Sequence, residues 1–240
     1  MGVPVATPRC LTGSTLWCTN ISVVHQLSLN GARLSDHAYE QLKRMIVRGE
    51  LPPGSLVTER ELTARLVIGR TPLREALQRL VSDYFLAVVP GGGYLVSEIS
   101  LDSAARIYEL RRPIEGLSAR LAAERATAED VDALEEFVHS ASRPVSGKDG
   151  HWHLAKDGEF HDLVARTSRN EYLRSTVKQL FSLTQRVLTQ TRPRTPRLED
   201  ELPFYETLTE LIGLHEPEQA EQVMLEHVRW KENLDGVVLE

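Results

Sequence analysis

The stretch RTPLREALQRL, residues 70–80, decides the fold of the first part of this chain. Its leucines recur at helical spacing and predict a buried stripe made of Leu73, Leu77 and Leu80. Arg70 and Arg74 lie one turn apart on a different face. Because proline is tolerated in the first turn of a helix, Pro72 indicates that the helix starts nearby. We therefore predict a short amphipathic helix whose polar face carries two arginines.

Helix and hairpin signals flank this stretch on both sides. Upstream, a first helix is predicted over residues 38–49, and Thr58 with Glu61 forms a capping box that opens a second short helix. Downstream, the period changes to that of strands, so residues 85–89 and 94–96, on either side of a glycine run, predict a β-hairpin. Three helices followed by a hairpin predict a winged helix-turn-helix.

The helix at residues 70–80 has the composition of a DNA-reading helix. The second helix of a helix-turn-helix enters the major groove with its N-terminal residues at the base edges, where arginine can bind guanine through two hydrogen bonds. Arg70, Thr71 and Arg74 occupy that position here. Arg60 of the preceding helix would reach the backbone or the groove edge. The alternative is a solvated charged face, and spacing alone leaves both interpretations open.

From residue 101 onward the sequence predicts only helices. One apolar face begins at Ala104, and Thr127 caps a second helix. Further helices are predicted at residues 150–167, 170–190, 199–213 and 217–233. Six helices of this length predict an antiparallel bundle. The predicted fold class is therefore mainly α, with a winged helix-turn-helix and its small β-hairpin wing over residues 33–98, followed by an all-α bundle over residues 100–235.

The net charge of −6 looks unsuited to DNA until it is divided along the chain. Residues 1–32 carry +1, residues 33–96 carry +2 and residues 97–240 carry −9. A mildly basic front and an acidic back fit a protein whose first domain alone meets phosphate. The 41% hydrophobic and 26% charged content is that of a globular protein.

The first 32 residues show no periodicity and are predicted to be a flexible lead. They contain both cysteines, Cys10 and Cys18, so neither a disulfide framework nor a zinc ribbon is indicated. They do not have the pattern of a secretory signal, and no apolar stretch approaches the ~20 residues that span a bilayer. We therefore expect a cytoplasmic protein.

Three motifs in the first part resemble the DNA-binding domain of the GntR family. They are LPPGSL at residues 51–56, EREL at residues 59–62 and RTPLREALQRL at residues 70–80. The resemblance covers residues 33–97. It implies DNA contacts by Arg60, Arg70, Thr71 and Arg74, with a wing glycine at Gly93.

The chain departs from that family in three places. Val67 stands where glycine is usual, and a β-branched residue is poorly suited to the positive φ of such a turn. Gly69 stands where a capping Ser or Thr is usual. Val88, Val89 and Gly92 stand where the wing often carries arginines. We therefore expect a weaker grip on phosphate than is usual, with DNA binding retained.

Asp157 and His161 are four residues apart on one predicted helix, so both side chains project from the same face. His227 lies on the last helix, which a bundle can fold against that one. One carboxylate and two imidazoles suit Zn, Ni, Fe or Mn and leave positions open for a ligand. The alternative is a surface ion pair or a core histidine, because such a pair easily arises by chance among eight histidines.

The bundle region resembles the FCD ligand-binding domain of the FadR-type GntR regulators over residues 101–233. The motifs that carry the resemblance are Glu109-Leu110-Arg111, Glu115, Leu121-Ala122-Ala123, Asp157-x-x-Phe160-His161, Asn170-x-x-Leu173 and Glu226-His227. The resemblance implies a divalent metal, held by one Asp and three His, that helps bind a small organic acid.

Asp157, His161 and His227 match three of those metal ligands, and Tyr205 stands where the other His is usual. A neutral phenol is a poor ligand at pH 7. The metal would therefore be held by three side chains, be held more weakly, or be absent. The predicted effector contacts are Arg111, Tyr205 and Arg186, with a helix-surface or interdomain salt bridge as the alternative for the arginines.

The combined prediction is a ligand-responsive bacterial transcription regulator, a repressor rather than an activator, and not an enzyme. As a homodimer it would bind an inverted repeat in double-stranded DNA, and a carboxylate-bearing metabolite would rearrange the two DNA heads. One rival is a metal-dependent hydrolase that uses Asp157, His161 and His227. The other is a helical interaction scaffold with a vestigial DNA head, which would lack sequence-specific, salt-dependent DNA affinity.

Overall fold

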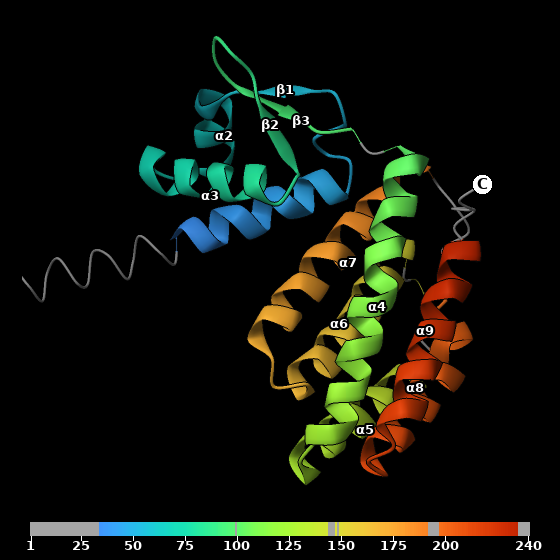
Figure 1. Cartoon of the computed structure of the whole chain (residues 1–240). Helices are drawn as coiled ribbons and strands as arrows, with labels where there is room; N and C mark the ends of the chain where they lie inside the picture. The colour runs from blue at the N-terminus through green and yellow to red at the C-terminus, as the bar shows by residue number, and fades with distance from the viewer. Residues whose placement is uncertain (1–33, 99, 144–146, 148, 192–196, 235–240) are drawn as a thin grey trace, which may run out of the picture.

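The computed structural model describes residues 34–98, 100–143, 147, 149–191 and 197–234, so the predicted lead at residues 1–32 lies outside the described residues. A first helix runs through residues 34–47. The elements that follow are β1 (Leu56–Val57), α2 (Glu59–Leu66), α3 (Arg70–Ser82), β2 (Leu86–Val88), β3 (Tyr94–Val96), α4 (Leu101–Arg125), α5 (Ala128–Ala141), α6 (Gly150–Thr167), α7 (Glu171–Thr191), α8 (Leu198–Gly213) and α9 (Pro217–Leu234). The fold is mainly helical with a small sheet, which confirms the predicted class (Figure 1).

The helices of the first part pack as the sequence predicts. The Thr58 hydroxyl accepts a hydrogen bond from the Glu61 amide, and the Glu61 carboxylate accepts one from the Thr58 amide at 3.1 Å, which is the expected capping box. The leucine stripe of α3 is fully buried in the hydrophobic core of this part; it comprises Leu73, Leu77 and Leu80. The stripe therefore leaves the arginine-bearing face of α3 to solvent.

The wing adds a third strand to the predicted hairpin. β3 lies in the middle and pairs antiparallel with both β2 and β1. β1 is only two residues long, too short to show an alternating pattern, so the sequence did not reveal it. At Gly93 φ is +116°, and a Cβ there would lie 3.0 Å from the carbonyl oxygen of Val57. The wing therefore requires glycine at this position for its own geometry.

The turn between α2 and α3 holds Val67 in a left-handed conformation with φ 53°. This backbone costs a non-glycine residue roughly 1–2 kcal/mol, and the Val67 side chain, 90% exposed, recovers little of that cost by burial. We expect Val67→Gly to raise the free energy of unfolding by about 0.5–1 kcal/mol, after allowing for the greater freedom of glycine in the unfolded chain. Urea unfolding would measure the change.

Val88→Gly is the matched control, because Val88 is also exposed but lies in the strand β2. Glycine inside a strand weakens it, so the two substitutions should change stability in opposite directions. Destabilisation by both would show that the backbone at residue 67 is not strained.

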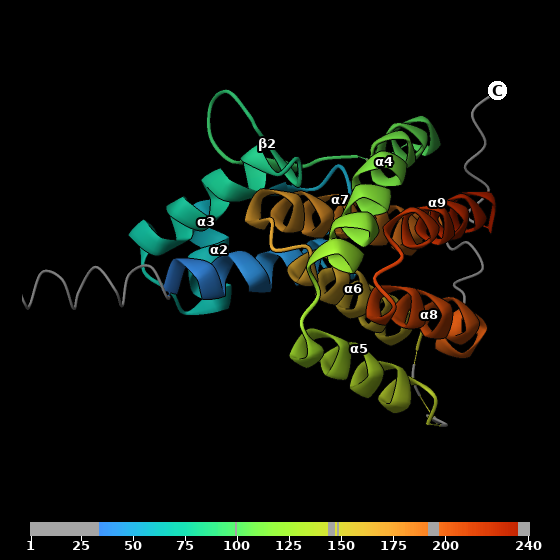
Figure 2. The ribbon, with the colours of Figure 1, turned by 60° about the horizontal axis from the view of Figure 1, so that its bottom comes forward.

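The second part is a layered helical bundle. α4 lies between α7 and α9 in Figure 1, and Figure 2 shows α6 and α8 as a second layer beside these three, with α5 packed on the outer side of α6 and α8. The bundle core contains large apolar side chains from several helices, among them Phe160, Val164, Leu208, Ile212, Met224 and Val228. No helix in the described ranges combines the length and the apolar character that crossing a membrane requires.

The two parts meet along α7 and the first turns of α4. Leu183 of α7 belongs to the hydrophobic core of the first part, and Ile107 of α4 packs against the cores of both parts. Arg186 of α7 is fully buried and donates from Nη1 to the carbonyl oxygen of Tyr84 at 3.3 Å. Side chains of the bundle therefore contact directly the segment that follows α3.

Candidate functional site

The predicted DNA contacts lie on the exposed surface of α2 and α3. Arg60, Arg70, Thr71 and Arg74 are all exposed, and they sit at or near the N-terminal ends of these two helices. Arg74 Nε donates to both carboxylate oxygens of Glu59, at 2.9 and 2.8 Å. Arg74 is thus positioned by a neighbour on α2, while its side chain remains 60% exposed.

The N-terminus of α3 is open to an anion. Gly69 is the N-cap, its backbone is extended, and it supplies no side-chain hydrogen bond to the first turn. That turn also contains no acidic residue. Helix N-termini present unpaired N–H groups and partial positive charge, which favour phosphate. The glycine removes a capping hydroxyl but leaves these donors available.

A cluster of buried polar side chains lies inside the bundle. Asp157 and His161 of α6 and His227 of α9 each place one ligand atom within 4.8 Å of the others, so the predicted donors are brought together as a possible metal site. All three residues are at most 5% exposed. The imidazole of His227 stacks on Phe204 of α8, with ring centroids 3.6 Å apart.

Tyr205 of α8 belongs to the same cluster. Its hydroxyl oxygen lies 3.0 Å from Asp157 Oδ1 and 3.1 Å from Glu201 Oε2. Because a phenol carries one hydrogen, it can donate to only one of these carboxyl groups and must accept from the other. Burial and the neighbouring Asp157 raise the pKa of Glu201 to about 8. The raised pKa favours a protonated Glu201, which would supply the second hydrogen that this arrangement needs.

An ammonium group completes the cluster. Lys231 of α9 is 3% exposed, and its Nζ donates to Asp157 Oδ2 at 2.8 Å and to Glu201 Oε1 at 2.7 Å. Burial alone would lower the pKa of Lys231, but the attraction of Asp157 and Glu201 outweighs burial and raises it. Burial likewise opposes the charge on Asp157, yet Lys231 and the nearby histidines hold the pKa of Asp157 well below its usual value.

A chain of buried ion pairs connects α4 to this cluster. Arg111 Nε donates to Glu115 Oε1 at 2.5 Å, and Arg111 Nη1 donates to Thr184 Oγ1 at 3.3 Å. The second Glu115 oxygen is in close contact with His161 Nδ1, while His161 Nε2 lies 3.2 Å from Asp157 Oδ1. Burial lowers the pKa of His161, but the two carboxylates raise it overall to about 9. His161 is therefore a charged bridge between Glu115 and Asp157.

Several buried polar atoms of this region make no hydrogen bond to the described residues, among them Arg111 Nη2 and His227 Nε2. His227 Nε2 lies 3.7 Å from Glu201 Oε2, beyond hydrogen-bond distance. A buried polar group left unpaired costs roughly 1–3 kcal/mol, and more when it is charged. A molecule that accepts a hydrogen bond from Arg111 would remove that cost, so the cluster is suited to an anionic ligand.

Sequence reasoning missed Lys231 and Glu201. Both carried a spacing signal, because Lys231 follows His227 by four residues and Glu201 precedes Tyr205 by four. Charged residues at such spacings are also common on solvated helix faces. Only the packing of α6, α8 and α9 shows that these two groups are buried together.

Arg186, a predicted effector contact, lies at the joint between the two parts of the molecule. It donates to the Tyr84 carbonyl, and its guanidinium carbon lies 5.8 Å from the centre of the Phe85 ring. Burial lowers the pKa of Arg186 to about 10. Arg186 therefore lies between the two parts, as the predicted alternative of an interdomain salt bridge requires. Its partner is the backbone carbonyl of Tyr84 and not a carboxylate.

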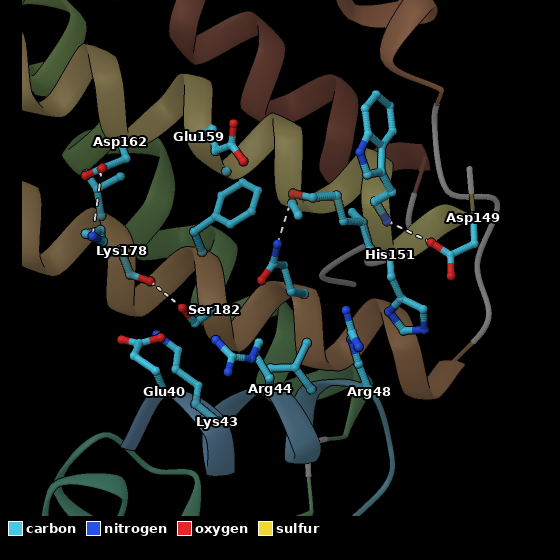
Figure 3. A pocket seen from close by; sticks show the side chains of 18 of the residues that line it. Glu40, Lys43, Arg44, Arg48, Asp149, His151, Glu159, Asp162, Lys178 and Ser182 are labelled. Atoms are coloured by element: carbon cyan, nitrogen blue, oxygen red, sulfur yellow. Dashed lines mark hydrogen bonds and ion pairs between the residues drawn. The ribbon is translucent and has the colours of Figure 1, made fainter. Parts of the chain in front are cut away.

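A pocket of about 680 Å³ also opens at this joint (Figure 3). The helix of residues 34–47 contributes Glu40, Lys43 and Arg44, while α6 and α7 face them across the pocket. Charges of both signs line it, including Asp162 and Lys178. The first part therefore touches the bundle over only part of its facing surface.

The geometry defines a class of protein: a winged helix-turn-helix with exposed arginines, mounted on a helical bundle that contains a buried charged cluster. Residues 34–96 match the family model described as "Bacterial regulatory proteins, gntR family", and residues 106–229 match the FCD domain. The chain therefore belongs to the GntR family of bacterial regulatory proteins, in its FCD branch. It is a transcriptional regulator of the FadR type.

Individual relatives agree with this assignment. The Nta operon transcriptional regulator of Aminobacter aminovorans is 35% identical over 137 residues, which are 57% of this chain and 64% of that protein. The HTH-type transcriptional repressor GlaR of Escherichia coli (strain K12) is 29% identical over 201 residues, 79% of this chain and 90% of that one. The structure named E. coli McbR/YncC shares the fold, with a TM-score of 0.67, 21% identity and coverage of 84% and 96% of the two chains. These similarities favour a regulator over the hydrolase and scaffold alternatives.

Proposed function

We propose that this regulator is a repressor that binds an inverted-repeat operator as a homodimer and releases it when a small organic anion enters the bundle. The observation that carries the proposal is the buried guanidinium of Arg111, which keeps one nitrogen unpaired and is linked through α7 to the DNA-binding part. The name of GlaR as a transcriptional repressor supports the direction of regulation.

A second copy of the chain would cover an apolar face of the bundle. Leu110 and Leu117 lie seven residues apart on α4 and are 55% and 40% exposed, so they share one face. Trp230, on the adjoining α9, is 40% exposed. Two-fold symmetry across such a face would present two α3 helices to half-sites about 34 Å apart, one turn of DNA.

The effector proposed for the cluster is a carboxylate. A carboxylate can accept two hydrogen bonds from one guanidinium, and Arg111 has a free nitrogen for it. Because Arg111, His161 and Tyr205 are all at most 1% exposed, a ligand reaches them only when neighbouring helices separate. Entry and rearrangement are thereby linked, as an effector requires.

The rearrangement would reach DNA through α7. Arg111 is bound to Thr184 of α7, and Arg186, two residues further along that helix, is bound to Tyr84 just after α3. A ligand that competes for Arg111 would change the position of α7 relative to α4. The contact at Tyr84 would then change the orientation of the DNA-binding part.

Fluorescence anisotropy would test the function with duplexes that the full chain selects from a randomised pool. We expect the selected sites to be inverted repeats and the affinity to fall steeply with salt. A thermal-shift panel of mono- and dicarboxylic acids should yield at least one that stabilises the protein and lowers operator affinity by about 5- to 150-fold. Selection of no common sequence, or stabilising acids that never change operator affinity, would refute the proposal.

Arg186→Met is expected to weaken the response to the effector while leaving operator affinity without effector nearly unchanged. Only one hydrogen bond of Arg186 to the described residues is seen, and replacing a poorly paired buried charge with an apolar residue is often neutral for stability. The measurement is the ratio of operator affinities with and without the stabilising acid.

Arg125→Met is the control, because Arg125 Nη1 also donates to a backbone carbonyl, that of Ser168, at 2.8 Å but within the bundle. The control should retain the full response. An unchanged ratio in Arg186→Met would mean that the contact at Tyr84 does not transmit the signal.

A further inference from the structure

Asp157, His161 and His227 offer the donor set of a divalent metal site, but both oxygens of Asp157 already have partners among the described residues. Its Oδ2 accepts a hydrogen bond from Lys231 at 2.8 Å. Its Oδ1 lies 3.0 Å from the Tyr205 hydroxyl and 3.2 Å from His161 Nε2. A metal would have to displace these contacts, because it binds a carboxylate oxygen at about 2.0–2.2 Å.

Lys231 also opposes a metal by its charge. Its ammonium lies within hydrogen-bond distance of both Asp157 and Glu201, the two carboxyl groups that a cation in this cluster would approach. A divalent ion bound to Asp157 would stand a few ångströms from this ammonium in a buried site, where like charges repel strongly. The residue at the position of the usual third histidine, Tyr205, offers a phenol hydroxyl that is already in contact with Asp157 and Glu201, in place of an imidazole lone pair.

We propose that the ammonium of Lys231 takes the place of the metal ion in this cluster, so that the sensor site is assembled by an organic cation and contains no metal. Lys231 joins α9 to α6 through Asp157, one of the three predicted metal donors, and to α8 through Glu201. One cation fills the position, and the donor set cannot hold a second. The proposal concerns this site alone and does not depend on the identity of the effector.

The first test uses the full-length wild-type chain and needs neither DNA nor effector. After exposure to Zn²⁺, Ni²⁺ or Mn²⁺ and removal of free ion, elemental analysis should find no stoichiometric metal. Chelator should leave the unfolding temperature unchanged. About one metal ion per chain, released by chelator with a fall in the unfolding temperature, would overturn the proposal. The metal measurement uses no DNA and the regulator function is tested by operator binding. Failure of one proposal can therefore be distinguished from failure of the other.

The second test removes the ammonium. Lys231→Ala frees Asp157 and Glu201, so the variant should gain a site for about one Zn²⁺, Ni²⁺ or Mn²⁺ per chain and be stabilised by that ion. Lys231→Ala/His161→Ala is the matched control and should lose the gained site. Failure of folded Lys231→Ala to bind any of the three ions would contradict the proposal. If Lys231→Ala folds only when a metal is present, recovery of folded protein by Zn²⁺, Ni²⁺ or Mn²⁺, but not by Mg²⁺, also supports the proposal.

Discussion

Arg70→Ala combined with Arg74→Ala should weaken operator binding by about 2–6 kcal/mol, because each arginine that reads a base contributes about 1–3 kcal/mol. Both side chains are exposed on α3, and the burial of the leucine stripe fixes the face they occupy. Neither supports the hydrophobic core, so the variant should fold as the wild type does. Anisotropy titration at a fixed salt concentration near 0.15 M would give the change in affinity.

Arg143→Ala is the control for loss of positive charge. Arg143 is exposed after the end of α5 and is not among the predicted DNA contacts. It should change operator affinity by less than about 0.5 kcal/mol, since salt weakens the effect of an exposed charge that does not contact DNA. If the double α3 variant binds the operator as tightly as this control, the recognition surface lies elsewhere.

Arg111→Met is expected to cost about 3–5 kcal/mol of folding free energy, the usual effect of removing one partner from a buried ion pair. Arg111 and Glu115 are each 1% exposed, so Glu115 would keep a buried charge without its closest counter-ion. Arg111 together with His161 now holds the pKa of Glu115 at about 2, despite the opposing effect of burial. Urea unfolding monitored by circular dichroism would measure the loss.

Arg112→Met is the control next to it in sequence. Arg112 is 29% exposed and lies 3.6 Å from Glu232, a partly solvated pair that should contribute less than about 1 kcal/mol. Replacing Arg111 with Met and Glu115 with Leu together should recover part of the stability lost by Arg111→Met, because the carboxylate that loses Arg111 is removed while His161 keeps Asp157 as a partner. Equal losses in Arg111→Met and Arg112→Met would refute a special role for the buried pair.

Local patterns were sufficient for the DNA-binding part. The capping box at Thr58, the leucine stripe of α3 and the glycines of the wing each act over a few residues, so the chain carries these signals within short windows. The left-handed turn at Val67 was expected from the resemblance to the GntR family, in which glycine is usual at that position. The strand β1 was not predicted, because two residues are too few to show an alternating pattern. Its pairing with β3 is a contact between segments that are distant in sequence.

The bundle helices could also be predicted, and so could the shared face of Asp157 and His161, because helical spacing fixes which side chains of one helix share a face. The addition of His227 to this pair was implied by the resemblance to the FCD domain. Spacing does not say which faces meet. The contact of Arg186 could not be predicted, because it depends on how α7 packs against the segment at Tyr84. The pocket between the two parts depends on the same packing.

The sequence alone determined the helices of this protein, because they depend on interactions within a few turns, and its motifs determined the class through their resemblance to the GntR family and the FCD domain. The tertiary structure alone decided the character of the sensor site. Lys231, Glu201 and Asp157 come from three different helices, and each would be an ordinary solvated charge on its own. Burial brings the ammonium of Lys231 and the two carboxyl groups together away from water. Their mutual contacts then determine which cation the site can hold.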